Sequence, residues 1–415
     1  MKHEPGLPDA LQAAMAGMTT LSTFSELEIC FMHRRNFFVK SSAVALAATM
    51  LGGVTNALAR RRQTTPTTTP PVTTAPVTTA PVTTASVTTG AINVLETIKA
   101  LRIPSGPYTG AYEIAPNGLM NWYFANLGLI SVVQYMDAPT LDQYIRVYLD
   151  LYISKLEPNL SIQDVHFTVG RANPSSFTLA LADSDDSYVA TLLSLATRYL
   201  RASQNWAWWD TNKAKLKDMA NRNIIASIKP SGLTSVFQSP RNQTNNAGYL
   251  MDNAEVYRGL RDFASVLRER GDTADAASYD QVATRMATAM GGLFSTSTSA
   301  FRMADLSTQT ETSFYPGTTC QVFPQAFGVS ELSGYYDRAW NFFHGNTPGW
   351  ETGTLDPYPW AVLGLAAAKR GQTALANAQL ASMENTFSVN RSILTINELG
   401  FYQRTRSVLA GRADV

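Results

Sequence analysis

Long hydrophobic runs with few polar interruptions recur along the chain from residue 117 onward, and several begin with acids. Residues 183–200, DSDDSYVATLLSLATRYL, place three aspartates in the first turn of a predicted helix that is otherwise apolar nearly all the way round. Such a helix is buried, and acids at its first turn are stabilised by the free backbone N–H groups and the helix dipole. Similar buried helices are predicted over 117–133, 251–268 and 356–368.

Amphipathic helices alternate with these buried ones. The spacing of apolar residues predicts amphipathic helices over 141–155, 211–228, 274–290 and 372–383. Gly271 and Gly371 lie where helical hairpins should turn. The alternation predicts an all-α fold in two layers, an inner set of helices covered by an outer set. A closed toroid of helical hairpins would bring the acidic helix starts to one face. Few segments are typical of strands, and 232–237 is the best candidate.

Composition excludes some classes of function. The 415 residues are 45% hydrophobic and 16% charged, enough for a large core, and the net charge of +1 offers no basis for binding nucleic acid. The two cysteines, Cys30 and Cys320, and the four histidines are not spaced like a zinc or haem site. We therefore expect no cofactor and no tightly held metal, and we expect a monomer.

The N-terminal 60 residues predict export. Within residues 32–59, the pair Arg34-Arg35 precedes a short apolar run that ends in A-L-A, which resembles a bacterial twin-arginine signal cleaved after Ala59. The alternative is a membrane anchor, but the run is short and rich in alanine and glycine. We expect residues 1–31 to lie outside the fold. We also expect a secreted, periplasmic or cell-envelope protein without a stable membrane span after cleavage.

A low-complexity segment follows the signal. Residues 61–90 contain PVTTA three times, with a proline at every fifth position and little that could be buried. This composition predicts an extended spacer, which is either a tolerated insert or a wall-spanning stalk. One domain is then expected from 91 to 415.

The acidic stretch D-S-D-D-S-Y-V-A-T-L-L-S-L-A at 183–196 resembles the segment that opens an inner helix in glycoside hydrolase family 8, of the six-hairpin (α/α)6-toroid glycosidase superfamily. The resemblance implies a glycoside hydrolase, which the predicted signal would export. It implies Glu113 as general acid, Asp183 as the carboxylate that grips the sugar, and Asp252 as base. The Ser-Glu-Gly that usually surrounds the acid in that family is absent here.

Carboxylates suit this reaction, because one protonated carboxyl protonates the leaving oxygen while an ionised one activates water or attacks the sugar. Sugar rings also pack on flat aromatic side chains. Each acid has a simpler interpretation as a helix cap, and each aromatic as core. Their coincidence at the starts of several helices favours a substrate site. The residues predicted to bind substrate are Tyr112, Asp185, Asp186, Tyr188, Tyr249, Glu255, Asp356 and Trp360.

Two other hypotheses stay open. A polysaccharide lyase or sugar epimerase on the same toroid would need a tyrosine or histidine base and cations that neutralise a uronate. Candidates for these roles are His166, Tyr112, Tyr257, Arg171 and Arg258. A carbohydrate-binding envelope protein without activity would use the same cleft and release no product.

Overall fold

The computed structural model describes residues 91–168 and 173–414. The predicted export signal and the Thr/Pro linker lie outside these described residues. None of the described helices is both long enough and apolar enough to cross a membrane.

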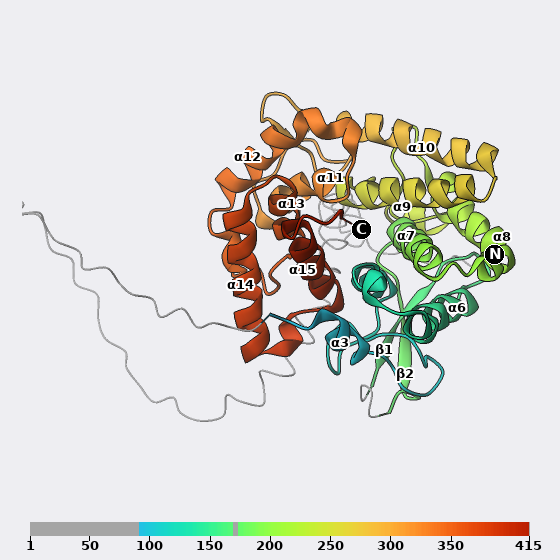
Figure 1. Cartoon of the computed structure of the whole chain (residues 1–415). Helices are drawn as coiled ribbons and strands as arrows, with labels where there is room; N and C mark the ends of the chain where they lie inside the picture. Colours follow the sequence, from blue (N-terminus) through green and yellow to red (C-terminus); the bar gives the residue numbers. More distant parts are fainter. Residues whose placement is uncertain (1–90, 169–172, 415) are drawn as a thin grey trace, which may run out of the picture.

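Helices in the described residues form two concentric layers (Figure 1). Each inner helix packs against the next one along the chain, and the last packs against the first, which closes a ring. The described inner helices are α4 (Trp122–Ile130), α7 (Asp186–Ser203), α9 (Leu250–Glu269), α11 (Phe323–Ala326), α13 (Val362–Lys369) and α15 (Ile396–Leu409). The fold is therefore an all-α (α/α)6 toroid, as predicted.

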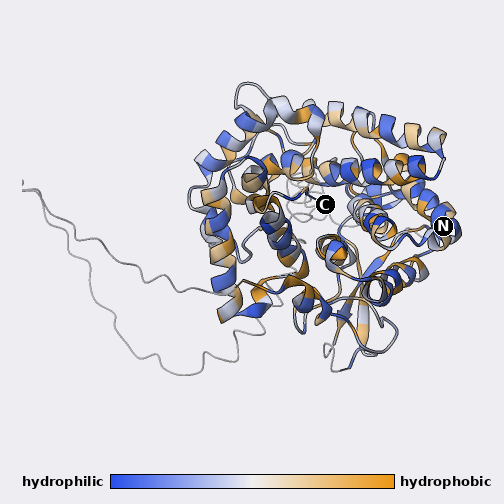
Figure 2. Cartoon of the chain, in the orientation of Figure 1, coloured by the Kyte–Doolittle hydropathy of each residue, from blue (hydrophilic) through white to orange (hydrophobic). Residues whose placement is uncertain are grey.

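The outer layer covers the ring. Its described helices are α3 (Val94–Lys99), α6 (Val147–Ser154), α8 (Trp206–Asn223), α10 (Thr273–Gly291), α12 (Tyr336–Asn346) and α14 (Thr373–Val389). In Figure 2 these helices carry both hydrophilic and hydrophobic positions, as amphipathic helices do. Gly271 and Gly371 have φ values of +84° and +72° at the α9–α10 and α13–α14 turns, which confirms the predicted hairpins.

Small residues let the inner helices approach one another closely. A Cβ atom at Gly259 of α9 would lie 2.4 Å from the carbonyl oxygen of Ala190 in α7. A Cβ atom at Gly400 of α15 would lie 2.8 Å from the carbonyl oxygen of Leu127 in α4. Both distances are too short for a side chain, so these glycines permit the backbone contacts that close the ring.

The structure corrects several predicted boundaries. The helix predicted over 117–133 begins at Trp122, because the side chain of Asn121 caps it by accepting a hydrogen bond from the N–H of Phe124. The helix predicted over 141–155 begins earlier with α5 (Ala138–Leu141), and a π-helical turn, Asp142–Arg146, leads into α6.

The strand predicted over 232–237 is wrong. In this segment Thr234 makes an isolated bridge with Ile228, and its N–H donates to the side chain of Asn253, 2.9 Å away. The described strands form two antiparallel hairpins, β1 (Gln163–Phe167) with β2 (Phe177–Leu181), and β3 (Phe294–Ser295) with β4 (Ala300–Phe301).

Candidate active site

A cavity of about 260 Å³ opens where the N-terminal ends of the inner helices meet. Because all six inner helices begin at this end, their free N–H groups and dipoles point toward the cavity. Its polar lining consists of Asn121, Asp164, Asp183, Asp356, Thr395, Asn397 and Glu398. Its apolar lining consists of Ile114, Tyr123, Phe124, Leu181, Met251, Tyr315, Phe323, Pro357, Tyr358, Trp360, Val362 and Phe401.

Asp164 on β1 forms one polar side of the cavity. Its Oδ2 accepts hydrogen bonds from Asn121 Nδ2 at 2.8 Å and from the hydroxyl of Tyr188 at 2.7 Å, and its Oδ1 accepts from the N–H of Trp122 at 3.3 Å. Burial raises the pKa of Asp164 well above its usual value, and the negative charge of Asp183 adds to this effect. Asp164 and Asp183 therefore form an acidic pair on this side of the cavity.

Glu398, in the first turn of α15, forms another polar side. It is buried, and its Oε2 accepts a hydrogen bond of 2.6 Å from the N–H of Ala361. The pKa of Glu398 is raised to about 7, mainly by burial; the hydrogen bond from Ala361 lowers the pKa and the negative charge of Asp356 raises it. A carboxyl with this pKa exchanges its proton near neutral pH, as a general acid or base must.

Aromatic side chains gather beside Asp356. Trp360 lies against Tyr315, with ring centroids 4.6 Å apart and an interplanar angle of 31°, and its Nε1 donates to Asp356 Oδ2 at 3.1 Å. The backbone of Trp360 has a φ of +54°, which is rare for a bulky residue. Strained conformations of this kind cluster at ligand-binding and catalytic sites.

Three of the predicted site residues, Asp183, Asp356 and Trp360, line the cavity. The other two predicted catalytic residues, Glu113 and Asp252, are buried and are not part of the lining, although Ile114 and Met251 next to them are. Their predicted roles stay predictions.

Several predicted substrate-binding residues lie beneath the cavity. Glu255 accepts a hydrogen bond of 2.5 Å from the hydroxyl of Tyr123, which lines it. The carboxylate of Asp186 accepts a hydrogen bond from the hydroxyl of Thr234 at 2.7 Å. Burial raises the pKa of Asp186 well above its usual value, and the negative charge of Asp252 adds to this effect. Glu255 therefore contacts the lining through Tyr123, whereas the hydrogen bond of Asp186 is to Thr234, which is not part of the lining.

The remaining predicted residues are held by protein contacts. Tyr112 is buried in an aromatic cluster and donates to the carbonyl of Tyr144 at 2.9 Å. Tyr249 is buried, and its hydroxyl accepts from Asn245 Nδ2 at 3.2 Å. Tyr188 holds Asp164 rather than lining the cavity.

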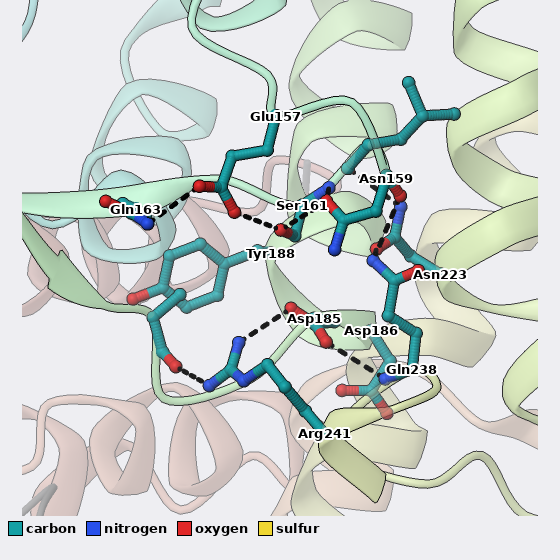
Figure 3. Close-up of polar contacts among 12 residues, drawn as sticks. Glu157, Asn159, Ser161, Gln163, Asp185, Asp186, Tyr188, Asn223, Gln238 and Arg241 are labelled. Atoms are coloured by element: carbon teal, nitrogen blue, oxygen red, sulfur yellow. Dashed lines mark hydrogen bonds and ion pairs between the residues drawn. The ribbon is translucent and has the colours of Figure 1, made fainter.

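Asp185 anchors a polar network that supports the acidic pair (Figure 3). Its carboxylate accepts from Arg241 Nη1 and from the N–H of Gln238, each at 3.0 Å. Arg241 also bonds the carbonyl of Ala182, and Gln238 Nε2 donates to Asn223 at 2.8 Å. This network fixes the segment just before α7, and so the position of Asp183.

The sequence reasoning missed two carboxylates of the cavity. Glu398 follows the same pattern as the acids it did identify, an acid in the first turn of an inner helix, so this signal was present. Asp164 lies on a strand that pairs with residues 10 to 18 positions further along the chain, and no local pattern marks it. Among the described residues, no cluster of three or more histidine, cysteine or carboxylate side chains could hold a metal ion.

Comparison with known proteins rests on structure, because no protein-family model matches the sequence and no curated protein matches it. A rhamnosidase from Klebsiella oxytoca with rhamnose bound superposes with a TM-score of 0.51 at 12% identity, over 74% of this chain and 57% of that one. A glycosidase variant superposes with a TM-score of 0.51 at 13% identity, over 77% of this chain and 96% of that one. A glycosidase variant in complex with glucose gives a TM-score of 0.50 at 13% identity with the same coverage. At these identities the matches show the fold, which is the helical toroid of these glycosidases.

Proposed function

We propose that this protein is a glycoside hydrolase that acts on a poly- or oligosaccharide through carboxylate general acid and base catalysis. The observation that carries the proposal is one cavity at the helix starts of an (α/α)6 toroid, with four carboxylates and an aromatic wall. The solved structures with the same fold that are named as glycosidases support it.

Glu398 and Asp183 are the proposed catalytic pair. Glu398 belongs to the start of α15 and Asp183 to the start of α7. Helix α4 lies between these two helices in the ring, and its start contributes Asn121 and Tyr123 to the same cavity. Glu398 would donate its proton to the leaving glycosidic oxygen, because burial keeps this carboxyl protonated up to about pH 7. Asp183 would take the proton of the attacking water, which is the inverting route. Asp164 and Tyr188 would hold Asp183 in place.

The charge of the cavity favours a neutral sugar over a uronate. None of the described residues that line it is a lysine, arginine or histidine, while four are acids. The candidates for a lyase lie elsewhere: the hydroxyl of Tyr257 donates to Glu331 at 2.6 Å, and Arg258 is paired with Asp262 at 3.0 Å. Arg171 lies outside the described residues. Hydrolysis therefore fits this cavity better than elimination.

The test is release of reducing ends from a panel of neutral glucans, chitosan and aryl glycosides. Glu398→Gln should lower kcat/KM by about 10²- to 10⁴-fold on any substrate that the wild type cleaves, since this is the usual contribution of a general acid. Glu96→Gln, on the exposed face of α3, is the matched control and should leave kcat/KM unchanged. Unchanged turnover in Glu398→Gln would remove this residue from the mechanism.

Export is proposed separately. The twin-arginine signal would carry the folded domain out of a bacterial cytoplasm, with cleavage after Ala59. N-terminal sequencing of the exported protein tests the cleavage site. Replacing both Arg34 and Arg35 by lysine should keep the full chain in the cytoplasm, and export of this variant at the wild-type level would contradict the proposal.

A further inference from the structure

The cavity mouth continues into an apolar surface on the hairpin of β1 and β2. Leu181 lines the cavity, yet 69% of its surface is exposed, and Leu179, two residues earlier on the same face of β2, is 53% exposed. Leu355, which directly precedes Asp356 of the lining, is 43% exposed. Figure 2 shows hydrophobic positions along this hairpin.

These three leucines are not scattered. Only five large hydrophobic side chains are exposed in the part of the chain that the structure describes. For the other two, Leu306 and Val389, neither the residue nor its direct neighbour in sequence lines the cavity. Single exposed apolar residues are normal on a protein surface. Leucines that extend from a cavity into solvent instead indicate a surface that a ligand covers.

The cavity itself is more aliphatic than sugar binding requires. Ile114, Met251 and Val362 line it beside the aromatic residues, and none of these three offers a hydrogen bond to a hydroxyl group. The cavity also carries four carboxylates, those of Asp164, Asp183, Asp356 and Glu398. The site thus combines acidic groups suited to a sugar with apolar side chains, and Leu181 and Leu179 extend this apolar lining outward along β2.

We infer that the substrate is an uncharged amphiphilic glycoside, whose sugar binds among the carboxylates and whose alkyl or aryl aglycone packs on Leu179 and Leu181. This inference rests on the proposed hydrolase function and names its substrate class. The aglycone is uncharged because the four carboxylates repel an anion and the leucine side chains offer no partner to a cation. The sugar then binds in the polar part of a ligand site and the aglycone on its apolar surface. Hydrolysis would break the bond between the anomeric carbon and the aglycone oxygen, which leaves with the proton of Glu398, while water supplies the new hydroxyl of the sugar.

Binding of an uncharged apolar dye tests the surface without knowledge of the sugar. The full chain is titrated with N-phenyl-1-naphthylamine, whose emission rises in apolar surroundings. Leu179→Thr/Leu181→Thr places threonine, which favours strands, at both positions. It should raise the dissociation constant of the dye by about tenfold or more, since each leucine would bury apolar side-chain area against the dye. Leu306→Thr/Val389→Thr is the matched control and should stay within about twofold of the wild type by the same area argument.

Displacement identifies the ligand class. Octyl β-D-glucopyranoside, used below its micelle concentration, should displace the dye, whereas methyl β-D-glucopyranoside should not. Absence of dye binding, equal weakening in both double variants, or equal displacement by the two glucosides would overturn the inference. A wild-type dimer that dissociates in Leu179→Thr/Leu181→Thr during sedimentation would assign the surface to a second copy of the chain and would also overturn it. These readouts do not use turnover, so a normal dye result together with no product from the wild type on the whole glycoside panel would refute the hydrolase proposal alone.

Discussion

The pKa of Glu398 predicts a measurable change in stability that does not depend on the substrate. Burial raises this pKa from 4.5 to about 7. Because the pKa is higher in the folded state, the contribution of Glu398 to the free energy of unfolding is fully present below pH 4.5 and is lost as the pH rises through about 7. The difference corresponds to roughly 3 kcal/mol in total, of which roughly 2.5 kcal/mol falls between pH 5 and pH 8.

Glu398→Gln isolates this contribution. Glutamine is neutral at every pH, has nearly the same shape, and its carbonyl oxygen can accept the hydrogen bond from the N–H of Ala361. The free energy of unfolding of the wild type should therefore fall between pH 5 and pH 8 by roughly 2.5 kcal/mol more than that of the variant. Other buried carboxyls, such as Asp164 and Asp186, titrate in both proteins and cancel in the comparison.

The assay is urea unfolding followed by far-ultraviolet circular dichroism at both pH values. Glu96→Gln is again the control, because this residue lies on the exposed face of α3. Parallel pH dependence in the wild type and in Glu398→Gln would refute the reasoning, since it would mean that Glu398 is not a buried carboxyl that holds its proton near neutral pH.

Three further predictions concern packing, the polar network and the aromatic wall. Gly259→Ala should destabilise the toroid by about 1–3 kcal/mol, because the new methyl group meets the backbone of α7, whereas Gly345→Ala, with no atom within 4 Å of its Cβ position, should leave the melting temperature the same or higher. Arg241→Ala should lower the free energy of unfolding, measured with denaturant at pH 7, by about 3–5 kcal/mol, since it leaves the buried carboxylate of Asp185 without its cation. At pH 4 the loss should be smaller because Asp185 takes up a proton, so a loss of the same size at both pH values would contradict this. Trp360→Ala should raise KM by about tenfold with little change in kcat, consistent with about 1 kcal/mol or more from an aromatic contact, and an unchanged KM would exclude Trp360 from the sugar site.

Local patterns were sufficient to predict the layered toroid. The apolar runs at 183–200 and 251–268 form inner helices, and Gly271 and Gly371 make the turns, because periodicity and φ preference are properties of a few neighbouring residues. Closure of the ring depends on contacts such as Gly259 with Ala190, which join distant segments. Closure was predicted because it would bring the acidic helix starts to one face, whereas periodicity alone predicts only the two layers.

The candidate site was predictable only in part. Asp183, Asp356 and Trp360 were found because they precede inner helices, and the same rule applied to α15 would have found Glu398. Which acid of 183–186 faces the cavity depends on Arg241, more than 50 residues away, since it draws Asp185 into the supporting network. Asp164 reaches the cavity through the register of a hairpin that no local signal predicted.

The central claim is that Asp183 and Glu398 act in one cavity to hydrolyse a glycoside. It is tested most directly by following sugar release by proton NMR for the wild type and for Asp183→Asn/Glu398→Gln on the same glycoside panel. The account predicts a hydrolysed sugar with the wild type and none above background with the double variant. Sugar release by the double variant at the wild-type rate, or binding of sugar by the wild type without any product, would contradict it.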